Sequence, residues 1–369
     1  MGSLASIHGS QHRIYATFCL RSSCRSTKNK YCNRLEFYNP SDNSWRCAGP
    51  IPGIPENHTL KGFAMVSISN FIYIIGGKLC KKENKDQERD ITVRVEVLRY
   101  DVNTREWSTC TPMTTPRFNF ACAVCDEKVY VAGGQCTVLT ARGTASAEVY
   151  EPGRDRWVEL PGMSRLRYKC VGVVWKGRFH VIGGFVERGD DGTVMPFVVE
   201  RSSVDVYDEE RCEWELMPGM WQLDVPPNQI VAVGERLFSS GDCLNSWKGH
   251  VEEYDGKLGI WSVVERSQSD RLNELLMSSS SWEGRMERVY VTMGAIGMRL
   301  YFLGGYRRGE ECVKMVYTFD MGVEGREGWR SLEPLVVLDH EEEVMEEEEE
   351  EEEEECVMEL CSHCCVVQL

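Results

Sequence analysis

The sequence predicts an all-β protein, a closed ring of six four-stranded antiparallel sheets known as a six-bladed β-propeller. Six times, a tyrosine or phenylalanine is followed by a tryptophan, seven residues later in five cases and ten in the last. These units recur at intervals of roughly 50 residues, a period typical of propellers and solenoids. The pairs are Tyr38/Trp45, Tyr100/Trp107, Tyr150/Trp157, Tyr207/Trp214, Tyr254/Trp261 and Phe319/Trp329.

Each unit divides into four short apolar runs. In the third unit they cover 120–124, 129–134, 147–150 and 156–160. Runs rich in β-branched and aromatic residues and bounded by Gly, Pro, Asp or Asn indicate strands. The second run ends in paired glycines in four units, where we expect positive φ or crowded backbones. The glycine pairs are Gly76-Gly77, Gly133-Gly134, Gly183-Gly184 and Gly304-Gly305.

The first unit lacks an inner strand, because the chain enters a second-strand pattern at Arg13. A last apolar run, Leu335–Leu338, follows the sixth unit, and we expect it to supply the missing strand; Leu4–His8 is the alternative donor. Closure would remove the open edges of the ring. The predicted organisation is an N-terminal segment at 1–11, a propeller at 12–338 closed by 335–338, and a largely disordered tail at 339–369.

Four stretches carry a family resemblance: "IYIIGG…VLRYDVNTREW", "VYVAGG…AEVYEPGRDRW", "FHVIGG…VDVYDEERCEW" and "LYFLGG…VYTFDMGVEGREGW". They resemble the kelch-repeat family over residues 12–338 and are most similar to the kelch domains of plant F-box/kelch-repeat proteins. The resemblance implies one four-stranded propeller blade per repeat. Two units depart from it, with Phe18-Cys19 and Gly241-Asp242 at the glycine positions. The short segment before the first strand leaves no room for an F-box, so we expect none.

The net charge of −16 comes almost entirely from the C-terminal region, because thirteen glutamates lie between 341 and 355. A block of like charge repels itself and is usually disordered. Two interpretations stay open, a solubilising tail and an interaction arm. The chain has seventeen cysteines and no apolar signal or membrane-spanning run. We therefore expect reduced thiols and a cytoplasmic or nuclear protein.

The sequence offers no constellation for catalysis. The histidines lack a metal-ligand spacing, and Cys122-x2-Cys125 has no second pair. We expect His180 to pack inside a strand, in the slot held elsewhere by Tyr or Phe. The prediction is a non-enzymatic protein with no cofactor and no metal. Alternatives are a small-molecule-binding or enzymatic propeller and a lipid-anchored adaptor, modified at Gly2 or at the cysteines beyond 355.

In a four-stranded meander, the loops between strands 1–2 and 3–4 share one face, and the loops between 2–3 and 4–1 share the other. The long connections here all belong to the second face, and loops on a rigid scaffold often carry binding. We expect this face to bind a protein partner through an acidic segment, and to bind no nucleic acid. If the acidic run is an interaction arm, we expect Glu341–Glu355 to compete for this face. The candidate contact residues are Arg21, Arg25, Arg117, Arg165, Arg167, Tyr168, Lys169 and Trp221.

The resemblance to F-box/kelch-repeat proteins adds one expectation to this surface. It implies a scaffold or a substrate-recognition subunit linked to ubiquitin-ligase pathways.

Overall fold

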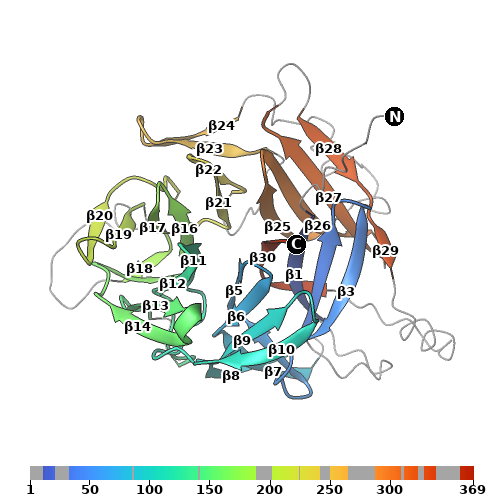
Figure 1. The fold of residues 1–369 in the computed structure, drawn as a ribbon, viewed down its shortest axis with the longest axis horizontal. Helices are drawn as coiled ribbons and strands as arrows, with labels where there is room; N and C mark the ends of the chain where they lie inside the picture. Colours follow the sequence, from blue (N-terminus) through green and yellow to red (C-terminus); the bar gives the residue numbers. More distant parts are fainter. Residues whose placement is uncertain are drawn as a thin grey trace, which may run out of the picture.

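The computed structural model is built almost entirely of strands, which follow one another around the molecule in chain order (Figure 1). It describes residues 11–20, 33–84, 87–139, 142–187, 202–223, 225–241, 250–264, 287–308, 311–322, 328–337 and 358–369. A single 3-10 turn, Pro152–Arg154, is the one helical element in these ranges. None of the described helical structure has the length and apolar character needed to cross a membrane.

Six sheets of four or five strands in the described residues match the six repeat units. The first contains β1 (His12–Leu20), β2 (Asn33–Asn39) and β3 (Ser44–Pro50); the second contains β5 (Ala64–Ile68), β6 (Phe71–Ile75), β9 (Val97–Asp101) and β10 (Glu106–Cys110). The third contains β11 (Ala121–Cys125), β12 (Lys128–Ala132), β13 (Ala147–Glu151) and β14 (Arg156–Leu160); the fourth contains β16 (Val171–Trp175), β17 (Arg178–Ile182), β19 (Val204–Asp208) and β20 (Glu213–Met217). The fifth contains β21 (Ile230–Val233), β22 (Arg236–Ser239), β23 (Glu252–Asp255) and β24 (Ile260–Val263); the sixth contains β25 (Glu287–Ile296), β26 (Arg299–Arg308), β27 (Glu311–Asp320) and β28 (Trp329–Leu332).

The six aromatic pairs lie directly opposite one another on the third and fourth strands of their sheets. Their ring centroids are separated by 4.9 Å for Tyr100/Trp107 and by 6.1 Å for Tyr38/Trp45, the two extremes. The Trp157 ring N–H also donates to the carbonyl of Thr111, which follows the preceding sheet, at 2.9 Å. The rings therefore combine packing with a polar tie between neighbouring sheets.

The predicted closing strand is wrong. Leu335–Val337 forms β29, which pairs in parallel with β3 at the outer edge of the first sheet. The inner position belongs to β30 (Met358–Gln368), which pairs antiparallel with β1. The expected division at 339 is therefore also wrong, since the last residues of the chain belong to the propeller. Leu335 and Val336 are 69% and 52% exposed at the outer edge, whereas β30 is packed against buried clusters on both of its faces.

The side chains of β30 alternate between its two faces, which explains why this strand fits the inner position. Cys361, Cys365 and Val367 pack into the core shared with the second sheet, around Tyr15 and Leu60. Met358, Leu360, Cys364 and Val366 pack on the other side, against the sixth sheet. A strand buried on both faces reads as a continuous apolar run, and cysteine behaves there as a small hydrophobe.

The new position of β30 changes the meaning of the acidic run. Glu341–Glu355 lies outside the described residues, but it connects β29 to β30 and so is joined to the fold at both ends. Because β29 runs parallel to β3, and β30 starts opposite the end of β1, both attachment points lie on one face. This is the face of the long connections.

Candidate interaction face

The two faces differ as the sequence predicts. Tight turns such as Ser69-Asn70 and Lys176-Gly177 lie on one face. The other, here called the long-connection face, is formed by the connections at 51–63, 76–96, 111–120, 133–146, 161–170, 183–203 and 218–229, of which 85–86, 140–141, 188–201 and 224 lie outside the described residues.

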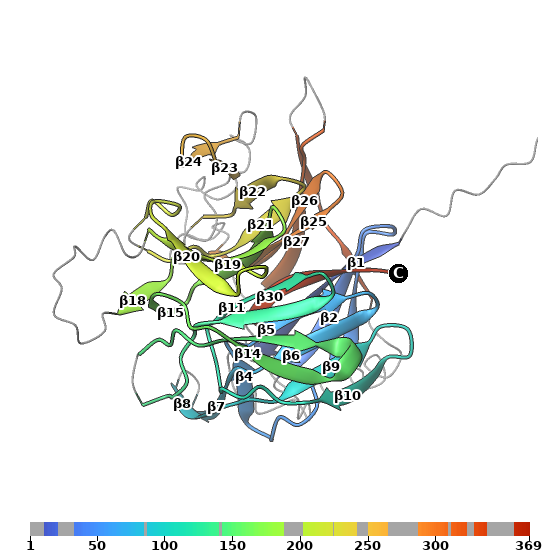
Figure 2. The same cartoon turned by 60° about the vertical axis from the view of Figure 1, so that its left-hand side comes forward.

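Additional strands lie within these long connections. Strands β4 (His58–Lys61), β7 (Lys78–Asn84) and β8 (Gln87–Val93) form a small sheet, and β15 (Leu166–Tyr168) pairs with β18 (Phe185–Glu187). Figure 2 shows β4, β7 and β8 together at one end of the molecule. The strands added to the six-sheet scaffold thus thicken this face.

Arg117, a predicted contact residue, is completely buried and serves the scaffold instead. Its guanidinium donates to Glu148 Oε1 at 2.8 Å, to the carbonyl of Gly133 at 2.9 Å and to the carbonyl of Ser146 at 2.8 Å. Its own carbonyl accepts the N–H of Gly77 at 2.8 Å. Arg117 therefore joins the glycine pairs of two successive sheets.

Arg167 repeats this arrangement one unit later. It is also fully buried, and its Nε donates to Asp205 Oδ2 at 2.7 Å while Nη1 donates to the carbonyl of Gly183 at 2.9 Å. Its carbonyl accepts the N–H of Gly134 at 2.7 Å. The predicted surface role of Arg117 and Arg167 is wrong, because each has a buried carboxylate partner that the sequence analysis did not consider.

The glycine pairs are required by this network. Gly133 has φ +69°, and a Cβ there would lie 2.8 Å from the carbonyl oxygen of Arg167. Gly134 has φ +89°, and a Cβ there would lie 2.6 Å from Cβ of Phe120. Only glycine tolerates both the positive φ and the close approach. The expected reason for this pair is confirmed.

The electrostatics of Glu148 follow from its partners. Burial raises the pKa of a carboxyl group, but the hydrogen bonds from Arg117 and from the N–H groups of Thr114 and Thr115 outweigh it. The pKa of Glu148 is therefore lowered, and its carboxylate stays charged while it holds the arginine.

The other predicted contact residues divide into three groups. Trp221 is buried, donates its ring N–H to the carbonyl of Val225 at 2.7 Å and packs on Trp261, so its predicted role as an exposed anchor is wrong. Arg165 and Tyr168 are half-buried, and Lys169 is exposed with Nζ 5.9 Å from the Phe185 ring centroid. Arg21, Arg25 and Gly2 lie outside the described residues.

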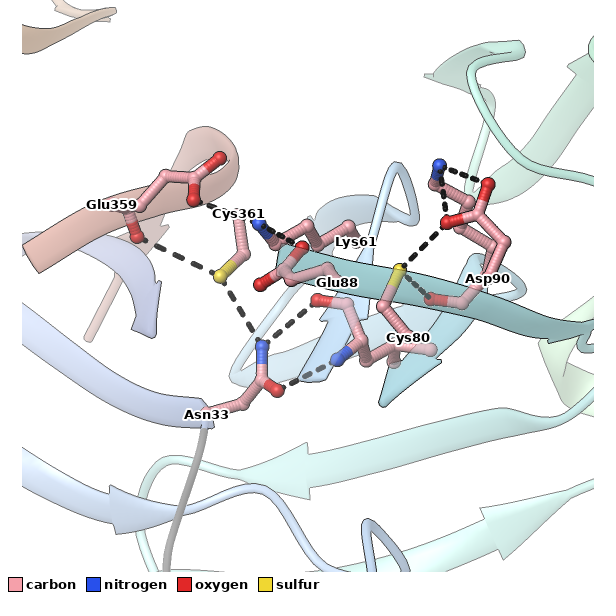
Figure 3. A network of polar contacts seen from close by, with 9 residues as sticks. Asn33, Lys61, Cys80, Glu88, Asp90, Glu359 and Cys361 are labelled. Atoms are coloured by element: carbon pink, nitrogen blue, oxygen red, sulfur yellow. Dashed lines mark hydrogen bonds and ion pairs between the residues drawn. The ribbon is translucent and has the colours of Figure 1, made fainter. Parts of the chain in front are cut away.

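Exposed charge on the long-connection face is concentrated on β7 and β8 and is largely paired. Lys61 contacts Glu88 at 2.8 Å and Glu359 of β30 at 2.7 Å (Figure 3). Lys78 contacts Asp90 at 2.8 Å, on the same small sheet. Lys81, on β7, is exposed. The small sheet is thus joined by ion pairs to the strand that closes the ring.

Hydrogen bonds from Asn33 of β2 also connect the small sheet to β30. Asn33 donates its side-chain N–H to the carbonyl of Leu60 at 2.9 Å and accepts the N–H of Leu60 at 2.8 Å. The same amide group donates to the sulfur of Cys361 at 3.2 Å (Figure 3). One side chain of β2 thereby fixes β4 and β30 together.

The predicted absence of metal ligands and the predicted role of His180 can be compared with the structure. Within the described ranges, no group of three His, Cys, Asp or Glu residues could hold a metal ion. His180 is buried at 4% exposure, with Nδ1 2.8 Å from the carbonyl of Arg178, which confirms a packed strand residue. Cys361, Cys364 and Cys365, three of the cysteines beyond 355, are buried in β30.

The sequence analysis missed Glu148 and Asp205, although a signal for them exists. Each stands two residues before the repeated tyrosine of its unit, as Glu36 does in the first unit. Glu36 is also buried and contacts Lys314 at 2.5 Å. An acidic residue at a fixed position of an apolar strand predicts a buried cationic partner, because an unpaired buried charge is costly.

Comparison with known proteins agrees with this architecture. The model of the Kelch motif matches residues 116–164, which contain Arg117, Glu148 and the glycine pair between them. Residues 116–164 of this chain therefore carry a kelch motif. The relatives of the chain include F-box/kelch-repeat protein SKIP30 of Arabidopsis thaliana, which is 28% identical over 88% of this chain and 83% of that protein.

Two further relatives match over shorter stretches. F-box/kelch-repeat protein At1g16250 of Arabidopsis thaliana is 34% identical over 47% of this chain and 46% of that protein. The human Kelch repeat and BTB domain-containing protein 12 is 30% identical over 43% of this chain and 26% of that protein. The chain therefore spans less than half the length of these two relatives.

Proposed function

We propose that this kelch-repeat protein is a non-enzymatic protein-interaction module that holds its partner on the long-connection face. The observation that carries the proposal is the concentration of added strands, β4, β7, β8, β15 and β18, on the connections of that one face. Loops and small sheets held by a rigid scaffold are the usual carriers of recognition. Relatives named for an F-box or a BTB domain support an interaction role.

The partner class that we propose is a protein with an acidic segment. With Arg117 and Arg167 buried, the positive charge available to it comes from exposed side chains such as Lys81 and Lys169. Such contacts are screened by salt, because the Debye length is about 8 Å at physiological ionic strength. The Glu341–Glu355 run, attached on the same face, is proposed to compete for them, and its double attachment makes that competition local.

The experiment measures binding of a fluorescent oligoglutamate peptide by anisotropy at low and at physiological salt. Lys81→Glu combined with Lys169→Glu should abolish binding at low salt. The matched control is Arg211→Glu combined with Lys257→Glu, which places the same charge change in exposed turns of the opposite face. Equal affinity of the two double variants would refute the proposed face.

A finer form of the proposal is that the kelch-repeat chain recognises substrates for a ubiquitin ligase. Affinity purification of the full chain followed by mass spectrometry tests it directly. Ubiquitin-ligase subunits should copurify together with a second, ubiquitinated protein whose recovery depends on Lys81 and Lys169. Recovery of partners without ligase subunits would leave an interaction scaffold and reject the ligase role.

A further inference from the structure

Cys19 and Cys361 form a thiol pair between the strand that begins the propeller and the strand that closes it. Cys19 lies near the end of β1, opposite Glu359 of β30. The pairing of β1 and β30 is irregular between Thr17 and Phe18, whose partners are Ser362 and Leu360. Cys361 is the extra residue at this irregularity. Both side chains belong to the same buried cluster.

Cys361 lies two residues beyond Glu359, the partner of Cys19, and both cysteine side chains pack into the same buried cluster, so the two thiols are neighbours across the strand pair. The interaction with the Cys361 thiol lowers the pKa of Cys19; burial and the charge of Glu359 oppose this effect, and the positive charge of Lys61 supports it. Burial raises the pKa of Cys361 well above its ordinary value. Of the two thiols, Cys19 is therefore the one that loses its proton more readily. A thiolate is the nucleophilic form of cysteine.

The surroundings hold the pair in position. Asn33 donates to the Cys361 sulfur at 3.2 Å, and Lys61 is ion-paired with Glu359, two residues before Cys361 (Figure 3). Both cysteines are free thiols, with exposures of 2% and 7%.

We propose that Cys19 and Cys361 form a reversible disulfide when the protein meets a hydroperoxide. The Cys19 thiolate attacks one peroxide oxygen, the O–O bond breaks, and the leaving oxygen takes a proton to become water or an alcohol. The sulfenic acid on Cys19 is then attacked by the sulfur of Cys361. The S–S bond forms, the S–O bond breaks, and the hydroxyl leaves with the thiol proton as water. Two thiols lose two electrons, and one peroxide is reduced.

The disulfide would link β1 covalently to β30, the strand that closes the ring. It joins residues 19 and 361, nearly the whole length of the chain. A cross-link stabilises a fold chiefly by restricting the unfolded chain, and more so for a long loop. The oxidised protein should therefore unfold at a temperature several degrees above the reduced protein, and a dithiol reductant should reverse the shift.

The test treats the full chain with hydrogen peroxide, blocks the remaining thiols, digests with trypsin and a glutamate-specific protease, and maps the cross-link by tandem mass spectrometry. Fragmentation is needed because Cys361, Cys364 and Cys365 share one peptide. We expect a Cys19–Cys361 link in the wild type and in Cys364→Ser with Cys365→Ser, and its loss in Cys361→Ser. Thiols that stay fully reactive, or a link to another cysteine, would overturn the proposal.

A second measurement avoids changing either cysteine. Lys61→Gln removes the positive charge near Cys19, so the second-order rate of disulfide formation should fall several-fold. Lys78→Gln is the matched control, because Lys78 lies on the same small sheet but pairs with Asp90. If both variants slow disulfide formation equally, or if neither slows it, the role of Lys61 in activating Cys19 is overturned.

Discussion

Replacing Arg167 by alanine is expected to destabilise the kelch-repeat fold severely. The guanidinium fills a fully buried site between the carboxylate of Asp205 and the carbonyls of Gly183 and Ser203. Removing it leaves a carboxylate with no exposed surface and no cation beside it. The carbonyl of Gly183 loses this donor at the same time, and the carbonyl of Ser203 keeps only the N–H of Gly183.

The magnitude follows from the burial of the pair. Breaking a buried ion pair by removing one partner costs about 3–5 kcal/mol, because a charge is left in a low-dielectric site. Each kcal/mol lowers the melting temperature of a large domain by about 2 °C. Arg167→Ala should thus melt about 6–10 °C below the wild type.

Differential scanning calorimetry and urea unfolding measure the effect. Arg211→Ala is the matched control, because Arg211 is 74% exposed and pairs with Glu213 across 3.6 Å at the surface. A surface pair of this kind contributes about 1 kcal/mol or less. Arg167→Met with Asp205→Asn should recover much of the loss, since no unpaired charge remains and an amide oxygen can still accept from Ser164.

Two results would refute the reasoning. An Arg167→Ala protein as stable as Arg211→Ala would mean that the buried pair contributes nothing measurable. A double variant no more stable than Arg167→Ala would mean that the lost contacts to the carbonyls of Gly183 and Ser203, and not the unpaired charge, dominate the cost.

The remaining predictions concern closure and pH. Truncation after His340 removes β30 and should abolish cooperative unfolding of the whole domain by circular dichroism; an unchanged transition would exclude β30 as the closing strand. Burial lowers the pKa of His180 from 6.5 to about 4, so its neutral form stabilises the fold fully above pH 6.5 and this contribution is lost as pH falls toward 4. His180→Phe should flatten the stability profile between these values, and an unaltered slope would contradict the assignment. The pKa of Glu148 is lowered, so its contribution is present above its ordinary value of 4.5 and lost as pH falls through the lower, folded value. Glu148→Gln should lower stability at neutral pH and lessen the loss on acidification, as measured by urea titration.

Local signals in the sequence were sufficient for the repeating part of the fold. These signals are the aromatic pairs, the apolar runs and the turn residues, which all lie within a single unit. Each of them reflects the pairing of neighbouring strands in that unit. The separation of tight turns from long connections follows from the order of strands in a meander. The long-connection face was therefore predictable, and so was the packed position of His180.

The buried arginines could not be assigned in the same way. Arg117 and Arg167 look like surface cations in a loop, and only the third strand of the next unit, with Glu148 or Asp205, makes them interior residues. Their contact depends on how neighbouring sheets stack. The acidic residue before each repeated tyrosine was the available signal, and it becomes informative only when paired with a cation 31 or 38 residues away.

The sequence by itself determined the kelch repeat, its six aromatic pairs and the face on which the long connections gather, because these depend on contacts within one unit. Only the tertiary structure decided which strand closes the ring. Leu335–Val337 and Met358–Gln368 are both apolar runs after the last repeat, but one lies at the outer edge and the other at the centre. The choice depends on burial against two sheets at once, and one of those surfaces, around Tyr15 and Leu60, comes from the opposite end of the chain.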